Sequence, residues 1–305
     1  MGKTPGKPCR RIAHRSAPAG LSIVELLVVV AILAALLGLL VPAVQWAREA
    51  VRATTCQNQV LHIGRAFQHH NETRRMYPTG GNEWWTPPNF IAGSPAIGLQ
   101  QDASWAFQIL PYLEEKTAWS PPGADDADRQ AAAIAAKIPG YFCPSRRGPQ
   151  SIRYASVNYM DGRELTHGLI DYAASNFQGD GVMVQAGSDR EARPRRAVDL
   201  TDGLSKTILV GEKRLNLAHL GEWQQDDNEG YTAGWDEDTI RRTDLEPQRD
   251  YHGDEDGEER FGSSHASTFS AVFADGSIHV LASDIDPTVF SSLGNIRDGR
   301  SVSDF

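Results

Sequence analysis

The chain has 305 residues, a formal net charge of −9 and 40% hydrophobic residues, which suits one or two folded domains. The acidic balance argues against a nucleic-acid partner, because such proteins need clustered Lys and Arg. Three cysteines are too few for a disulfide-dense scaffold or a four-cysteine zinc site. The composition therefore predicts an ordinary folded body attached to an unusual N-terminal segment.

Residues 1–20 form a basic leader without any acidic residue. The apolar run 21–41 follows and would span roughly 30 Å as a helix. We expect it to cross the inner (cytoplasmic) membrane once, with the basic N-terminus in the cytoplasm and the C-terminal domain in the periplasm or on the cell surface. A secretory signal peptide fits poorly, because Pro42-Ala43-Val44 is a weak cleavage site.

Residues 20–29 (GLSIVELLVV) resemble the prepilin-type signal of type IV pilins and type II secretion pseudopilins. The resemblance implies cleavage between Gly20 and Leu21 by a prepilin peptidase, which also methylates the new N-terminus. Leu21 departs from the usual Phe. The resemblance also implies that Pro42 kinks the helix.

Glu25 is an acid inside an apolar run, where burial in lipid is costly unless the carboxylate is paired. In a pilin-like assembly its partner would be the N-terminal amine of a neighbouring subunit, and the pair would set the register between subunits. The alternatives are a carboxylate that snorkels to the interface or is protonated, in a plain membrane anchor.

The helix is expected to cover residues 21–72, because two apolar stripes continue beyond the membrane span and Tyr77-Pro78 follows. Residues 73–305 would form an extracytoplasmic head with an acidic insertion at 222–260. The expected fold class is α+β: a long N-terminal transmembrane, pilin-like helix and a mostly antiparallel β domain with short helices.

Within the head, the sequence predicts a short helix at 103–115 that Pro111 interrupts, and a second helix at 125–138 with acidic residues at its start. Short β-like runs follow after Pro139-Gly140. They cover residues 154–159, 169–173, 182–184 and 207–211.

The clearest hairpin turns at Asp275-Gly276, for which we predict a two-residue loop. That register pairs Phe273 with Ile278 and Ala271 with Val280. Extended further, it places His265 opposite Asp286. The final helix would be capped by Asp286, with Pro287 at its first position.

Five blocks resemble successive parts of the domain-of-unknown-function family 1559, a planctomycete family of pilin-signal proteins. The blocks are residues 58–78, 104–115, 141–147, 200–213 and 261–287. The family is marked by a His, nine residues and then Asp-Gly, which here are His265, Asp275 and Gly276. The resemblance implies an architecture rather than an activity.

Cys56 and Cys143 would remain after Cys9 is lost with the leader. In an oxidising compartment we favour a disulfide between them, which would clamp the helix to the sheet domain. Two separate buried thiols are the alternative.

A hydrolase triad could be drawn from Ser263, Ser264, His265 and Asp275. The segment lacks a G-x-S-x-G elbow and the turn explains Asp275, so we expect no enzyme. His265 is expected to be a structural residue, held by a carboxylate or a backbone carbonyl.

No metal-ligating set is assigned. His69 and His70 are adjacent and point apart on a helix, and we expect His62 and His69 to be solvated. The acidic clusters between 222 and 260 could hold Ca²⁺, but they lack an EF-hand loop, so a solvated, mobile insertion is the default expectation and no cofactor is predicted.

The scattered tryptophans could line a glycan-binding surface, although such residues are more often core anchors. They are Trp84, Trp85, Trp105, Trp119, Trp223 and Trp235.

The sequence thus favours a membrane-anchored, pseudopilin-like assembly subunit linked to a type II secretion or type IV pilus-like system. Its expected partners are the prepilin peptidase/methyltransferase, the membrane and other pilin-like subunits through the N-terminal helix. The alternative is a surface-anchored module that binds a solute or glycan and does not polymerise.

Overall fold

The structure is a computed structural model and describes residues 2, 22–156, 159–190, 192–254, 259–302 and 305. It divides into two units, residues 1–48 and residues 49–305. Gly20 and Leu21, the expected processing site, lie outside the described residues.

Helix α1 (Ile23–Arg74) confirms the long helix and continues without interruption through Pro42. In the N-terminal unit its apolar side chains are exposed. In the second unit the helix buries a stripe that includes Val60, Ile63 and Phe67, a spacing that repeats on one helical face. The last third of α1 is therefore part of the core of the head.

The central sheet of the head has five strands in the order β11-β10-β6-β5-β7. Every neighbouring pair is antiparallel except β5 and β7, so the expected mostly antiparallel sheet is confirmed. Its strands are β5 (Tyr172–Ser175), β6 (Ile208–Glu212), β7 (Ile240–Arg241), β10 (Thr268–Phe273) and β11 (Ile278–Ala282).

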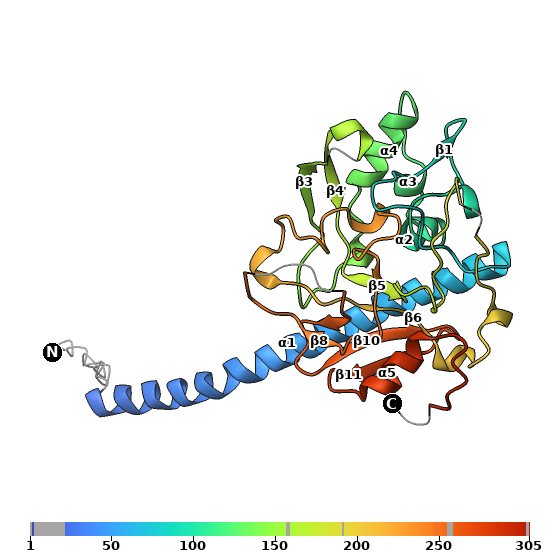
Figure 1. Cartoon of the computed structure of the whole chain (residues 1–305). Coiled ribbons are helices and arrows are strands. Elements are labelled where there is room, and N and C mark those ends of the chain that lie inside the picture. The colour runs from blue at the N-terminus through green and yellow to red at the C-terminus, as the bar shows by residue number, and fades with distance from the viewer. Residues whose placement is uncertain (1, 3–21, 157–158, 191, 255–258, 303–304) are drawn as a thin grey trace. The chain divides into compact units, whose positions relative to one another are not determined.

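The two faces of this sheet are covered by different elements. Val272 of β10 belongs to the large core cluster that contains the buried stripe of α1. Phe269 and Phe273 of the same strand belong to a second cluster with Phe290 of helix α5 (Pro287–Gly294). Because side chains alternate along a strand, α1 and α5 pack on opposite faces. Figure 1 shows α5 beside β10 and β11.

Smaller elements complete the head (Figure 1). The short helices are α2 (Trp105–Gln108), α3 (Lys116–Trp119) and α4 (Asp126–Ala135). The two-stranded sheets pair β1 (Phe90–Ile91) with β2 (Ser94–Pro95), β3 (Ser151–Ala155) with β4 (Glu164–Gly168), and β8 (Gln248–Arg249) with β9 (Gly262–Ser263).

Several expected elements are present with shifted bounds. The helix predicted at 103–115 is split into α2 and a 3₁₀ turn at Leu110–Tyr112 that contains Pro111. Asp286 caps α5 by accepting hydrogen bonds from the N–H groups of Thr288 and Val289. The run 182–184 was wrongly predicted as a strand: Val182 and Met183 are buried, but the run forms no ladder.

The predicted register of the β10–β11 hairpin is wrong by one residue. Val272 lies opposite Ile278 and Ser270 opposite Val280. The N–H of Gly276 donates to the Phe273 carbonyl, and Gly276 has a φ of +86°. The loop is therefore a three-residue turn with a glycine bulge instead of a two-residue turn, and the extra residue shifts the ladder.

The expected pairing of His265 with Asp286 is wrong as well. The ladder between β10 and β11 starts at Thr268 opposite Ala282, and the chain before Thr268 leaves the sheet. The ring of His265 instead approaches Glu49 and Glu212. Asp286 caps α5 and has no contact with His265 in the described part of the chain.

The acidic segment 222–260 is largely packed, which corrects the expectation of a solvated, mobile insertion. Asp226, Asp227, Glu229 and Asp238 are each at most 2% exposed. Basic side chains from elsewhere in the chain pair with several of them, as described below. A local count of charges does not reveal such partners.

Candidate functional site

The start of α1 gives Glu25 a local partner. The Ser22 N–H donates to the Glu25 carboxylate at 2.8 Å, and the Glu25 N–H donates to Ser22 Oγ at 3.2 Å. This reciprocal pair is a capping box, which satisfies N–H groups that a helix start leaves free. Its sequence signature is S-x-x-E, which our sequence interpretation did not consider.

The segment after Glu25 is the most apolar part of α1. It contains an 18-residue window with a mean hydropathy of 3.0, none of which is buried. Leu26, Ile32, Leu36 and Leu40 are all more than half exposed. By length and composition α1 is a candidate membrane span, consistent with single-pass anchoring.

In the head, three of the sequence blocks noted above converge on one place. The segment after Tyr141 supplies Cys143 and two arginines. Strand β6 ends at Glu212 and is followed by Lys213, and the loop between β9 and β10 supplies His265. Helix α1 adds Cys56 and Glu49. Residues far apart in sequence therefore build one buried, charged junction.

His265 lies between two carboxylates. Its Nδ1 is 3.2 Å from Glu49 Oε1 and its Nε2 is 3.4 Å from Glu212 Oε1. The contact with Glu212 raises the pKa of His265 above its usual value, against the opposite effect of burial, and Glu49 adds to it. This geometry is that of a structural histidine held by carboxylates, and its ionised form is the stabilised one.

A disulfide lies directly against this histidine. Cys56 of α1 and Cys143 are bonded, with Cα atoms 5.1 Å apart, and neither residue is exposed. Cys143 Sγ is 3.7 Å from His265 Nε2. Ser145 Oγ donates to Glu49 Oε1 at 2.8 Å, so the same junction ties α1 to this loop by a covalent bond and by polar contacts.

The remaining residues of the His-to-Asp-Gly motif have a different role. Asp275 Oδ1 accepts hydrogen bonds from the N–H and the hydroxyl of Ser277. Asp275 thus organises the hairpin turn, and no contact in the described part of the chain joins it to His265. Ser263 Oγ donates to the Thr268 carbonyl and Ser264 Oγ to Asp250, so neither hydroxyl is directed at the histidine ring.

A buried ion-pair network extends from the junction. Arg146 pairs with Asp250 at 2.7 Å, and Arg147 pairs with Asp171 at 2.7 Å and also with Asp227. Lys213 joins the network at 3.2 Å from Asp227. Burial alone would raise the pKa of Asp227, but Arg147 and Lys213 lower it to about 2.

This network explains the acidic clusters and was missed from the sequence. The tandem arginines 146–147 and the Glu212-Lys213 pair were visible as parts of the blocks, but their partners lie 14 or more residues away. Buried charges must be paired, so a segment rich in acids inside a folded head indicates matching bases elsewhere.

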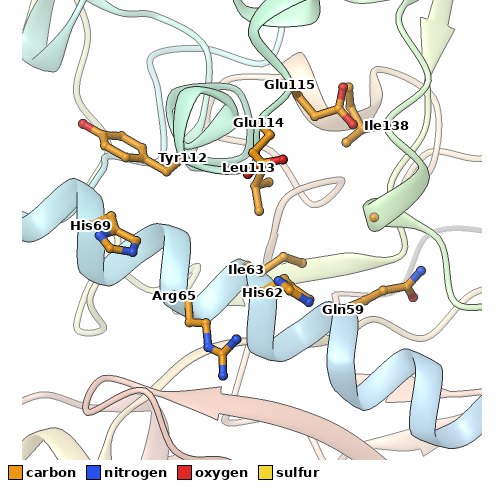
Figure 2. A pocket seen from close by; sticks show the side chains of 11 residues that line it. Gln59, His62, Ile63, Arg65, His69, Tyr112, Leu113, Glu114, Glu115 and Ile138 are labelled. Atoms are coloured by element: carbon orange, nitrogen blue, oxygen red, sulfur yellow. The ribbon is translucent and has the colours of Figure 1, made fainter.

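Figure 2 shows a cavity between α1 and residues 112–115. Its volume is about 470 Å³. His62 and His69 line it and are exposed, as expected for solvated residues. His70 does not line this cavity: it is buried, its Nδ1 lies 3.1 Å from the Met76 carbonyl oxygen, and burial lowers its pKa to about 4. The adjacent histidines thus do not share a site.

A second cavity of about 690 Å³ lies beside the acidic segment. Two tryptophans, Trp84 and Trp223, are among its lining residues, and Trp223 is 53% exposed. Trp105, by contrast, is fully buried and donates its indole N–H to the Thr239 carbonyl. Trp105 is therefore a core anchor, whereas Trp84 and Trp223 line this cavity.

Glu229 and Asp236 also line the second cavity. Burial and the nearby Asp238 carboxylate raise the pKa of Glu229 to about 9. Burial and the neighbouring carboxylates likewise raise the pKa of Asp236 well above its usual value. The ionised forms of both side chains are therefore unfavourable in the structure as it stands.

The comparison with known families agrees with the resemblance carried by the five sequence blocks. A family model described as "Protein of unknown function (DUF1559)" matches residues 45–288. No curated protein and no solved structure matches the chain. Because the match covers most of the chain, from the middle of α1 to the start of α5, the protein belongs to the DUF1559 family.

Proposed function

We propose that this protein is a membrane-anchored, pseudopilin-like subunit that is processed after Gly20 and assembles through its N-terminal helix. The observation that carries the proposal is the exposed apolar surface of residues 23–41 in a helix that continues into the core of the head. Lipid or other helices would remove this surface from water. In this proposal the protein acts by binding and assembly, without catalysis.

The capping box allows the role of Glu25 to be tested sharply. Glu25→Gln removes the charge but keeps a side chain that can complete a capping box. Ser22→Ala removes the reciprocal cap but keeps the charge. If Glu25 pairs with an amine of a neighbouring subunit, Glu25→Gln should abolish assembly and Ser22→Ala should leave it largely intact.

The readout is the intact mass and N-terminal sequence of the protein in membrane and sheared-surface fractions. A chain that starts at Leu21 and occurs in the sheared fraction supports processing and assembly in a type II secretion or type IV pilus-like system. A chain that retains residues 1–20 contradicts the proposal. Loss of assembly in Ser22→Ala but not in Glu25→Gln would mean that Glu25 acts only as a cap.

A second candidate function is binding of a solute or glycan by an anchored head that does not polymerise. The exposed indole of Trp223 beside a cavity of about 690 Å³ favours it, because sugars stack on exposed aromatic rings. Trp223→Ala should abolish binding to an oligosaccharide panel. The control change Val198→Ala, at an exposed residue that does not line the cavity, should not. Unchanged binding in Trp223→Ala, or no binding by the natural protein, would exclude this function for the cavity.

A further inference from the structure

Three carboxylates lie close together beside the second cavity, and two of them, Glu229 and Asp236, line it. Each of Glu229, Asp236 and Asp238 has a carboxylate oxygen that lies within 4.8 Å of an oxygen of the other two. Two oxygens that each bind a Ca²⁺ ion at about 2.4 Å can be no farther apart than this. We propose that this carboxylate cluster forms a Ca²⁺ site, with Glu229 and Asp236 as its principal ligands.

The charge balance of the cluster favours a cation. Asp238 is already compensated, because Lys213 Nζ lies 3.4 Å away and the N–H groups of Glu229 and Gly230 donate to its carboxylate. In the described part of the chain, no Lys, Arg or His forms an ion pair with Glu229 or Asp236. Two buried carboxylates therefore face one another without a positive partner, which a divalent ion would supply.

Both principal ligands keep an oxygen atom for the ion. The Tyr154 hydroxyl donates to Glu229 Oε1, which leaves Oε2. The Asp238 N–H donates to Asp236 Oδ1 at 2.8 Å, which leaves Oδ2. These bonds hold the two side chains in place without occupying all of their acceptor capacity.

An independent observation comes from Asn228. This residue is 6% exposed and lines the same cavity, and its amide oxygen Oδ1 has no hydrogen-bond partner. A buried carbonyl oxygen without a partner is unfavourable unless it binds a donor or a cation. An amide oxygen is an ordinary Ca²⁺ ligand, so Asn228 fits as a third ligand.

The donor set identifies the ion. It consists of carboxylate and amide oxygens only, which suits hard cations and not zinc or copper. The ligands come from irregular loops, and Ca²⁺ tolerates irregular geometry better than Mg²⁺ does. The cavity beside them gives the ion a path to solvent and room for water ligands. The proposal does not depend on whether the protein assembles.

The test uses the full chain in detergent after treatment with a chelator. Ca²⁺, and in parallel Mg²⁺, is titrated by calorimetry, and the Tm is measured with and without each ion. We expect about one Ca²⁺ per chain, a higher Tm in Ca²⁺ and weaker binding of Mg²⁺. Asp236→Asn should weaken Ca²⁺ binding at least about tenfold, whereas the exposed carboxylate change Asp284→Asn should have no effect.

The chelated state provides a second readout that does not rest on affinity. Asp236→Asn keeps an acceptor for the Asp238 N–H and removes one uncompensated charge, so without Ca²⁺ its Tm should equal or exceed that of the natural protein. With Ca²⁺ the natural protein should have the higher Tm of the two. The proposal is overturned if the natural protein binds no Ca²⁺, if Asp236→Asn binds it equally well, or if that variant is less stable in chelator.

Discussion

The Nδ1 atom of His265 lies 3.2 Å from the Oε1 atom of Glu49, which is 216 residues away in the sequence. With Glu212 on its other ring nitrogen, the histidine connects α1 to the end of β6. The family motif residue thus holds the helix against the sheet rather than facing solvent.

The pH dependence of stability should reveal the ionisation of His265. Because its folded pKa is raised, ionised His265 stabilises the fold below its unfolded pKa of about 6.5, and this contribution is lost as the pH rises through the folded pKa. His265→Gln cannot ionise and should cost about 2 kcal/mol at low pH. Guanidinium unfolding from about pH 5 to about pH 9 should show the difference shrinking with increasing pH.

The exposed histidine change His252→Gln is the matched control and should show no such trend. A difference between the natural protein and His265→Gln that stays constant over this range, or grows with pH, would contradict the assignment.

Removal of the disulfide should destabilise the head. The bridge between Cys56 and Cys143 spans 87 positions of sequence, for which the chain-entropy model gives about 4–5 kcal/mol. The double change Cys56→Ser/Cys143→Ser should lower the free energy of unfolding by this order. Cys9→Ser, which alters a cysteine of the leader, is the control. Equal stability of the double variant and the natural protein under oxidising conditions would rule out this role for the bridge.

Gly64 allows β10 to lie close to α1. A Cβ atom at this position would lie 2.4 Å from Val272 Cγ2. Gly64→Ala should therefore destabilise by about 1–3 kcal/mol through overpacking, although alanine is the better helix former. Thermal unfolding of Gly64→Ala/Val272→Ala should show partial rescue relative to the sum of the two single changes, and strict additivity would speak against the contact.

Removal of a cation from the buried network should destabilise the fold more than removal of one from a surface ion pair. Arg147→Leu leaves Asp171 and Asp227 without their shared guanidinium and should cost about 3–5 kcal/mol. Arg153 and Glu164 form a pair whose side chains are 69% and 55% exposed, so Arg153→Leu should cost less than about 1 kcal/mol. Urea unfolding compares the two variants, and similar losses would contradict the burial of the network.

Sequence patterns within a short stretch of chain predicted the helices, whose formation depends mainly on neighbouring residues. The apolar periodicity located α1, and the Asp286-Pro287 pair identified the start of α5. The hairpin was found, but its register depended on whether Asp275-Gly276 forms a two-residue or a three-residue loop. That choice depends on the backbone conformation of one glycine, which the sequence does not specify.

The contacts of the junction could not be predicted in the same way. His265 depends on Glu49 and Glu212, and Asp227 depends on Arg147 and Lys213, partners that only the folded topology brings together. Acidic residues next to one another in sequence were therefore interpreted as solvated, although their neutralising charges come from other blocks.

The contact between α1 and β10 also constrains the order of events during biosynthesis. Gln68 on α1 donates to the carbonyl of Ala274 at 2.6 Å, and Gly64 lies against Val272, so the helix is covered by residues of the β10–β11 hairpin. A ribosome makes α1 before it makes the hairpin that covers it, and most of the other elements of the head lie between the two in the sequence. Until this hairpin has emerged, the buried stripe of α1 must be shielded by another agent, such as a chaperone or the export machinery, and the core of the head cannot close.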